Sequence, residues 1–125
     1  MAGELILIVE DNDKNLKLAR DVLQFHGFRT VEATDGESAI RMSAEHLPAL
    51  ILMDIQLPGI DGIAALARIR ADARTAGIPT VALTASVMSG DRERFTQAGF
   101  DGFIAKPIDV SRFPDQVREH LGKRA

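Results

Sequence analysis

The sequence predicts a doubly wound α/β fold, in which helices cover both faces of a five-stranded parallel sheet. Three observations support this class. Short apolar segments of strand length alternate with helix-period segments along the whole chain. Several of the strand-length segments are continuously apolar, as strands covered on both faces are. The length of 125 residues fits one domain with its own core.

Five segments have the composition of strands. The first is an apolar run that stops at Glu10-Asp11-Asn12, and the second alternates between apolar and polar residues as a half-exposed strand does. The third runs straight into Asp54, after which Leu57-Pro58-Gly59 breaks it. The predicted strands are Leu5–Val9, Phe28–Ala33, Leu50–Met53, Thr80–Leu83 and Gly102–Ala105.

Five helical segments follow these strands. In the first, Leu16, Ala19 and Leu23 share one stripe, Asp13 is the predicted N-cap and Gly27 ends the helix. The predicted helices are Asn15–Phe25, Glu37–Glu45, Ile63–Ile69, Asp91–Ala98 and a last helix that starts near Ser111 or has an irregular first turn.

The last helix is predicted from a single stripe and a proline. Pro114 lacks an N–H donor and clashes with a preceding turn, so it must lie near the helix start. The apolar stripe consists of Val110, Phe113, Val117 and Leu121, which recur at spacings of three, four and four residues.

Right-handed crossovers place the carboxyl ends of all strands at one edge of the sheet, where ligands of such folds bind. Glu10, Asp11, Asp54, Thr84 and Lys106 all follow or end predicted strands. Each has an ordinary explanation when taken alone, as a solvated turn, a loop residue or an exposed lysine. Their joint arrival at one edge is what indicates a functional site.

The chemistry of that edge indicates a divalent cation and phosphoryl transfer. Three carboxylates repel one another unless a cation or protons neutralise them. Hard oxygen ligands suit Mg²⁺, whereas no cluster of His or Cys supports zinc. Asp54 can act as a carboxylate nucleophile, while Lys106 and Thr84 can stabilise a transferred phosphoryl group.

Composition excludes several other classes. The absence of cysteine excludes disulfides, thiolate metal sites and thiol nucleophiles. Fifteen basic and eighteen acidic residues give a net charge of −3 without a basic block, which argues against a nucleic-acid partner. No segment has the pattern of a membrane span or a signal peptide, so we expect a cytoplasmic protein with no membrane partner.

In order and spacing, these residues resemble the receiver domain of bacterial two-component response regulators. The resemblance covers essentially the whole chain. It implies a flavodoxin-like (βα)5 fold with strand order 2-1-3-4-5, and a single receiver domain over residues 1–125 without an output domain. The stretches that carry it are Ile8–Asn12, Leu52–Pro58, Ala82–Ala85 and Lys106–Ile108.

The resemblance implies a role for each site residue. Asp54 would accept a phosphoryl group from a histidine kinase or a histidine phosphotransfer protein. The Asp11 and Asp54 side chains, the Gln56 backbone carbonyl and, through water, Glu10 would bind Mg²⁺, for which Mn²⁺ can substitute. The protein would be a signalling domain with self-phosphorylation and autodephosphorylation chemistry, rather than a turnover enzyme.

The resemblance also implies a conformational switch. Thr84 and Lys106 would bind the phosphoryl group, and a cis Lys106-Pro107 peptide would aim the lysine into the site. Thr84 and Phe103 would then change a face formed by the fourth helix, fifth strand and fifth helix, to which a downstream protein binds. The candidate residues of that face are Val87, Met88, Arg92, Phe95 and Phe103.

Five further residues are expected to lie beside the site or away from it. Gln56 and Ser86 are expected to tune hydrolysis by controlling water access. His26, His46 and His120 are expected to be surface or packing residues.

Three alternatives remain open from the sequence. The chain could be the receiver of a hybrid kinase or a phosphorelay intermediate. An aspartyl-phosphate hydrolase of the haloacid dehalogenase type usually carries an aspartate where Gln56 stands, which counts against that class. A flavodoxin-like cofactor module would need a first loop with backbone donors and little negative charge, and the loop at Glu10-Asp11 is acidic.

Overall fold

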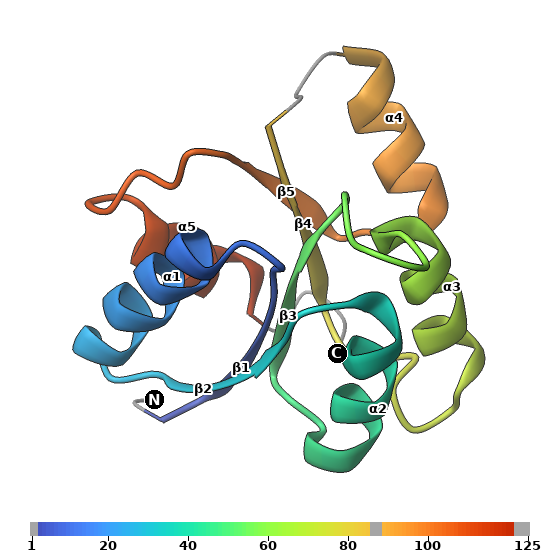
Figure 1. The fold of residues 1–125 in the computed structure, drawn as a ribbon, viewed down its shortest axis with the longest axis horizontal. Helices are drawn as coiled ribbons and strands as arrows, with labels where there is room; N and C mark the ends of the chain where they lie inside the picture. The colour runs from blue at the N-terminus through green and yellow to red at the C-terminus, as the bar shows by residue number, and fades with distance from the viewer. Residues whose placement is uncertain (1–2, 86–88, 122–125) are drawn as a thin grey trace.

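The computed structural model describes residues 3–85 and 89–121. These residues form a parallel sheet of five strands in the order β2-β1-β3-β4-β5 (Figure 1), which confirms the predicted fold class and strand order. The strands are β1 Leu5–Val9, β2 Arg29–Ala33, β3 Leu50–Asp54, β4 Thr80–Thr84 and β5 Gly102–Ala105.

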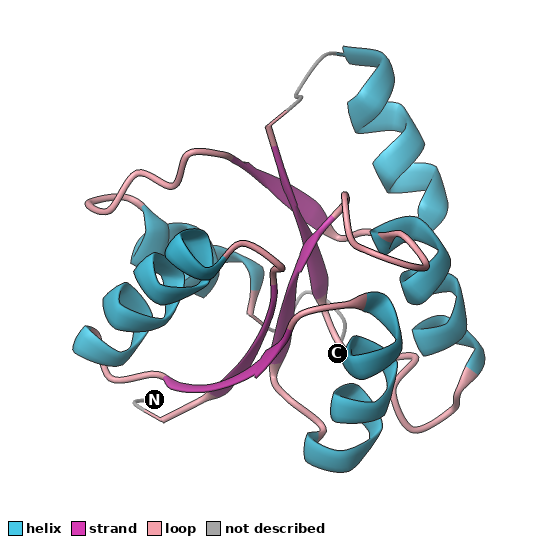
Figure 2. Cartoon of the chain, viewed as in Figure 1, coloured by secondary structure: helices cyan, strands magenta, loops and turns pink. Residues whose placement is uncertain are grey.

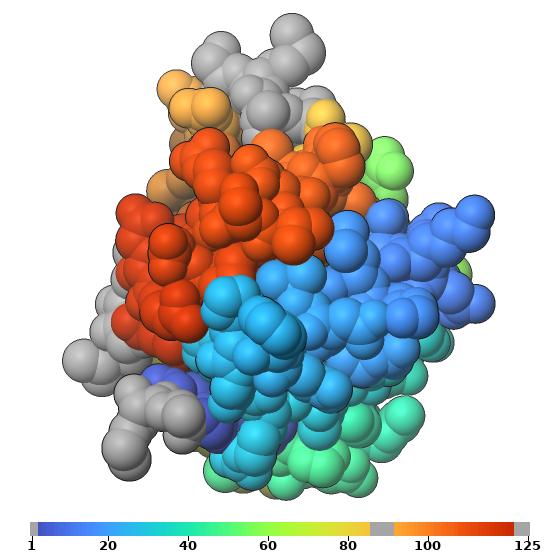
Figure 3. All heavy atoms as spheres, turned by 90° about the vertical axis from the view of Figure 1, so that its left-hand side faces the viewer, coloured from blue at the N-terminus to red at the C-terminus, as the bar shows by residue number. Residues whose placement is uncertain are grey.

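Helices cover both faces of this sheet (Figures 1 and 2). Two helices, α1 and α5, lie together on one face, and Figure 3 shows the segment after β5 packed directly against α1. The other three helices cover the opposite face. Their bounds are α1 Asp13–Phe25, α2 Gly36–His46, α3 Gly62–Ala71, α4 Ser89–Ala98 and α5 Phe113–His120.

The core is divided by the sheet into two clusters. In β1, Ile6 and Ile8 contribute to the cluster under α1 and α5, whereas Leu7 and Val9 contribute to the cluster under α2, α3 and α4. This alternation follows from the period of two along a strand. Because all four side chains are fully buried, the central strands hold the residues at their carboxyl ends in fixed positions.

The structure corrects the predicted start of α1. Asn12, and not Asp13, is the N-cap, because its backbone is extended and its side-chain oxygen accepts hydrogen bonds from the N–H groups of Lys14 and Asn15, both at 3.0 Å. Asp13 is the first helical residue. The predicted glycine at the other end is confirmed, since Gly27 has a φ of 91°.

The last helix also differs from its prediction. The regular helix starts at Phe113 rather than near Ser111, and residues 110–112 form an irregular turn before it, which was the other predicted possibility. Pro114 lies in the first helical turn, as its missing donor requires. Val110 lies outside the helix and is 52% exposed, so its place in the predicted apolar stripe is wrong. Phe113 and Val117 are fully buried, and Leu121 packs against the same cluster.

The strand boundaries place three predicted site residues. Asp54 and Thr84 are the last residues of β3 and β4, one residue beyond the predicted strand ends, and Lys106 follows β5 directly. No helix among the described residues is long and apolar enough to cross a membrane.

Candidate functional site

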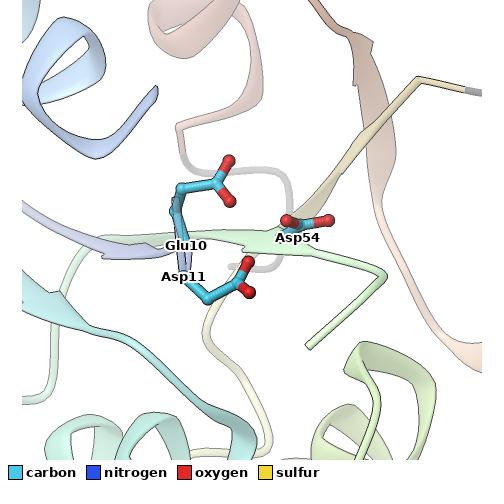
Figure 4. Close-up of side chains that lie close together, drawn as sticks. All are labelled: Glu10, Asp11 and Asp54. Atoms are coloured by element: carbon cyan, nitrogen blue, oxygen red, sulfur yellow. The ribbon is translucent and has the colours of Figure 1, made fainter. Parts of the chain in front are cut away.

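Three carboxylates meet at the carboxyl edge of the sheet (Figure 4). Glu10 and Asp11 follow β1, and Asp54 ends the neighbouring strand β3. One oxygen from each carboxylate lies within 4.8 Å of the others. Glu10 and Asp54 are buried, whereas Asp11 is exposed. The sequence prediction that these residues converge is therefore confirmed by their geometry.

Lys106 joins two of these carboxylates. Its Nζ lies 2.9 Å from Glu10 Oε1 and 3.1 Å from Asp54 Oδ2. Burial alone would lower the pKa of the Lys106 ammonium, but hydrogen bonds to Glu10 and Asp54 outweigh burial and raise this pKa. The lysine is therefore a fixed positive charge between two buried acids.

The pKa of Glu10 is raised as well, which for an acid favours the neutral form rather than the charged one. Burial raises the pKa of the Glu10 carboxyl, and hydrogen bonding to Asp54 adds to the rise while Lys106 opposes it. The Asn12 N–H donates to Glu10 Oε2 at 3.3 Å, so the start of α1 and Lys106 hold this carboxylate from two sides.

Asp54 is oriented through both of its oxygens. The Gln56 N–H donates to Oδ1 at 3.0 Å, and Lys106 donates to Oδ2. The residue is 5% exposed and belongs to a strand whose five residues are all buried. A carboxylate in this position is fixed by its strand and by two donors, and it still faces a cavity.

That cavity has a volume of about 230 Å³ and brings Thr84 beside Asp54 and Lys106. It also involves Arg94 and Phe95 of α4, which the sequence did not connect with the site. No motif marks them, because α4 has no strong apolar stripe that would have shown which of its residues face inward. The full lining is Asp54, Ile55, Gln56, Thr84, Ala85, Arg94, Phe95 and Lys106.

The predicted partner face needs one correction. Phe95 is 2% exposed and belongs to the core, so it cannot offer its side chain to a partner. Arg92 is exposed, and its guanidinium lies 4.8 Å from the ring centre of the half-buried Phe103. Val87 and Met88 lie outside the described residues.

The remaining predicted residues are placed as follows. The Lys106-Pro107 peptide bond is cis. Gln56 is exposed beside the site, and Ser86 lies outside the described residues. His26 and His46 are exposed, and His120 lies within hydrogen-bond distance of the Gln116 carbonyl, with its Nδ1 at 2.7 Å. None of the three histidines lines the cavity at Asp54.

The carboxylate cluster fits a hard divalent cation. Its donors are oxygens from three acids that would otherwise repel one another, and Mg²⁺ prefers such ligands while keeping several waters. Asp11 is exposed and Asp54 lines the cavity, whereas Glu10 is buried and does not line it. This arrangement suits direct ligation by the two aspartates more than by the glutamate.

Comparisons with known proteins agree with this geometry. A model of the response regulator receiver domain matches residues 6–118. The polar-differentiation response regulator DivK of Brucella anthropi is 42% identical over 117 residues, which cover 94% of this chain and 95% of that protein. DivK of Brucella melitensis matches with the same identity and coverage.

Solved structures give the same result. The receiver domain of the sensor histidine kinase PA1611 from Pseudomonas aeruginosa, which has a magnesium ion coordinated in its active-site cleft, is 36% identical with a TM-score of 0.88, and the match covers 98% of this chain and all of that one. The chemotaxis regulator CheY4 of Vibrio cholerae is 19% identical with a TM-score of 0.91, over 96% of this chain and 100% of that chain, which is a likeness of fold alone.

The DivK relatives share more identical positions with this chain than the kinase receiver does, so the hybrid-kinase alternative is not favoured. The family match covers most of the chain, and the DivK match covers nearly all of both proteins. The chain therefore belongs to the response regulator receiver domain family, the phosphoacceptor signalling domains that work with histidine kinases or phosphotransfer proteins.

Proposed function

We propose that Asp54 is the phosphoacceptor of this receiver domain. The observation that carries the proposal is its position as a buried carboxylate at the end of β3 that contacts Lys106, lies within reach of two further carboxylates and lines a cavity of about 230 Å³. Neither Glu10 nor Asp11 lines that cavity, so Asp54 is the member of the cluster with room for a phosphoryl group.

The transfer step follows from this geometry. An Asp54 carboxylate oxygen attacks the phosphorus of a phosphohistidine, so an O–P bond forms as the N–P bond breaks. The bonding electron pair returns to the donor imidazole nitrogen. Lys106 remains beside Asp54 and neutralises charge on the phosphoryl oxygens, and the Thr84 hydroxyl lines the same cavity and can bind one of them.

We assign the cation site to the same cluster. Asp11 and Asp54 would hold Mg²⁺ or Mn²⁺ through their side chains, Gln56 through its backbone carbonyl, and Glu10 through a water. The bound cation supplies positive charge to the transferring phosphoryl oxygens. Receiver domains in general bind Mg²⁺, and the acidic cluster of this chain, whose carboxylate oxygens lie close together, supports the assignment.

The signal would leave through α4, β5 and α5. Phosphorylation adds a charge of about −1.5 to −2, next to Thr84, whose strand pairs with β5. Arg92 on α4 covers Phe103 on β5, so movement of Thr84 and Phe103 would change the surface that Arg92 presents. In NMR spectra, phosphorylation should shift the amide signals of Arg92 and Phe103, and changes confined to the site would contradict this route.

That the protein resides in the cytoplasm stays a prediction from the sequence.

Intact-mass measurement tests the proposed function. Incubation with Mg²⁺ and acetyl phosphate should add one phosphoryl group, and EDTA should suppress the addition. Asp54→Asn should abolish it, because an amide cannot form the acyl phosphate. Asp13→Asn is the matched control, since it makes the same change at an exposed aspartate near the same edge. Equal labelling of Asp54→Asn and wild type would exclude Asp54 as the acceptor.

A further inference from the structure

The loop of residues 55–61 connects β3 to α3 and carries part of the candidate cation site. It begins immediately after Asp54 and includes Gln56. The first residue of each of two helices contacts this loop, and in both helices this first residue is a buried glycine. The two glycines are Gly62 of α3 and Gly36 of α2, and α2 lies beside α3 (Figure 1).

Gly62 contacts the backbone of the acceptor residue itself. Its N–H donates to the Ile55 carbonyl at 3.0 Å. A Cβ atom at this position would lie 2.6 Å from the Asp54 carbonyl oxygen and 3.0 Å from Ile55 Cα. Both neighbours are backbone atoms, so no side-chain rotation could make room. A side chain at position 62 would have to displace the end of β3.

Gly36 contacts the other end of the loop, at Ile60. Gly36 belongs to α2, a helix that contributes no side chain to the site. A Cβ atom here would lie 2.5 Å from Ile60 Cγ1 and 2.8 Å from the Ile60 carbonyl oxygen. The Ile60 side chain could turn away, but its carbonyl could not. Ordinary van der Waals contact begins at 3.4 Å, so the loop backbone at Ile60 would move by about 0.6 Å.

We propose that Gly36 and Gly62 are positioning residues that clamp the 55–61 loop and thereby set the affinity and selectivity of the cation site. This inference rests on the proposed function, because it concerns the ligand atoms of Asp54 and Gln56. Mg²⁺ requires near-ideal octahedral geometry with ligands at about 2.0–2.1 Å, whereas Ca²⁺ accepts flexible geometry at longer distances. A displacement of several tenths of an ångström therefore penalises Mg²⁺ more than Ca²⁺.

Gly36 gives the sharper test, because it lies outside the site and is held in the α2 N-terminus by a separate cap. The Asp35 side chain accepts from the Ser38 N–H at 2.7 Å, so α2 keeps its own start when position 36 changes. Gly77→Ala is the matched control. Gly77 is exposed, its φ lies outside the left-handed region and a Cβ there would meet no atom within 4 Å.

The experiment is a calorimetric titration of Mg²⁺ and Ca²⁺ into the full chain. For Gly36→Ala we expect a dissociation constant for Mg²⁺ about tenfold higher than in wild type, a loss typical of residues that support metal ligands. The loss for Ca²⁺ should be smaller, and Gly77→Ala should match wild type for both ions. Thermal unfolding in EDTA monitors the fold separately, because a purely structural effect lowers the melting temperature without changing the ratio of the two affinities.

Two results would overturn the inference. One is Mg²⁺ binding by Gly36→Ala that equals that of Gly77→Ala, and the other is an equal loss for both ions. If Gly36→Ala does not fold, Ile60→Ala is the substitute variant, because it loosens the same contact without adding atoms. It should also weaken Mg²⁺ binding. Unchanged Mg²⁺ binding by Ile60→Ala would then overturn the clamp. A wild-type chain that binds no Mg²⁺ would instead refute the proposed cation site, and the clamp with it.

Discussion

Lys106 is shared between two buried carboxylates, and this sharing determines how the site tolerates its own charge. Glu10 and Asp54 are almost fully buried, and each has an oxygen within about 3 Å of the same ammonium group. Without the lysine, two neighbouring acids would lose their common counter-charge. Removal of one partner from a buried ion pair is costly because it leaves the other charge uncompensated.

We therefore predict that Lys106→Met lowers the free energy of unfolding in EDTA by about 3 kcal/mol. Added Mg²⁺ should recover part of this loss, because the cation supplies positive charge to the same carboxylates. Denaturant unfolding with and without Mg²⁺ measures both effects. Lys14→Met is the control, since Lys14 is exposed and its loss should cost little. Equal losses in the two variants would refute this description of Lys106.

Residues of the site differed in how far the sequence could predict them. Asp54, Thr84 and Lys106 were predictable because each ends or follows an apolar strand, and parallel strands end at one edge. Arg94 lines the same cavity but was not predicted, because its place depends on how α4 is rotated against the sheet. Phe95 was predicted on the surface for the same reason and is buried.

At the scale of elements, helix starts depend on single capping residues. Asp35 caps α2, and hydrogen bonds from the side chain and the N–H of Ser38 lower the pKa of its carboxyl. The folded state therefore favours the carboxylate. This stabilisation is fully present above the unfolded pKa of about 3.9 and is lost as the pH falls through the lower folded value.

The resulting prediction concerns Asp35→Ala. Its loss of stability relative to wild type should be larger at pH 6 than at pH 3, as measured by thermal unfolding followed by circular dichroism. Asp35→Asn provides the control, because its amide can accept the same hydrogen bond but does not titrate across this range. A difference between wild type and Asp35→Ala that stays constant with pH would contradict the assignment.

Strands were predictable to within one residue because apolar runs with sharp polar ends, or in β2 a regular apolar–polar alternation, mark them. Helix starts were not, because Asn12 and Asp13 have equally good capping side chains and only the backbone conformation distinguishes them. Contacts between helix ends also could not be predicted from the sequence. The Arg70 side chain donates to the carbonyls of Ala76, Ile78 and Gly99 and to the Asp101 carboxylate, which ties α3 to the segment before β5.

At the scale of the whole molecule, the alternation of strands and helices predicts a parallel sheet but does not set the order of its strands. That order came from the family resemblance, and the structure confirms it. The consequence for function is that β1, β3, β4 and β5 lie side by side and deliver the site residues to one edge. The contact of Gly36 with Ile60 arises only when α2 and α3 pack together, so no local pattern shows it.

The central claim is that one carboxylate among the eighteen acidic residues of the chain accepts the phosphoryl group. Borohydride reduces an acyl phosphate to an alcohol with release of phosphate, so a phosphorylated aspartate becomes homoserine. After phosphorylation with acetyl phosphate and Mg²⁺, reduction and peptide sequencing by mass spectrometry should find homoserine at position 54. Reduced product at another acidic residue, with Asp54 unchanged, would contradict the account.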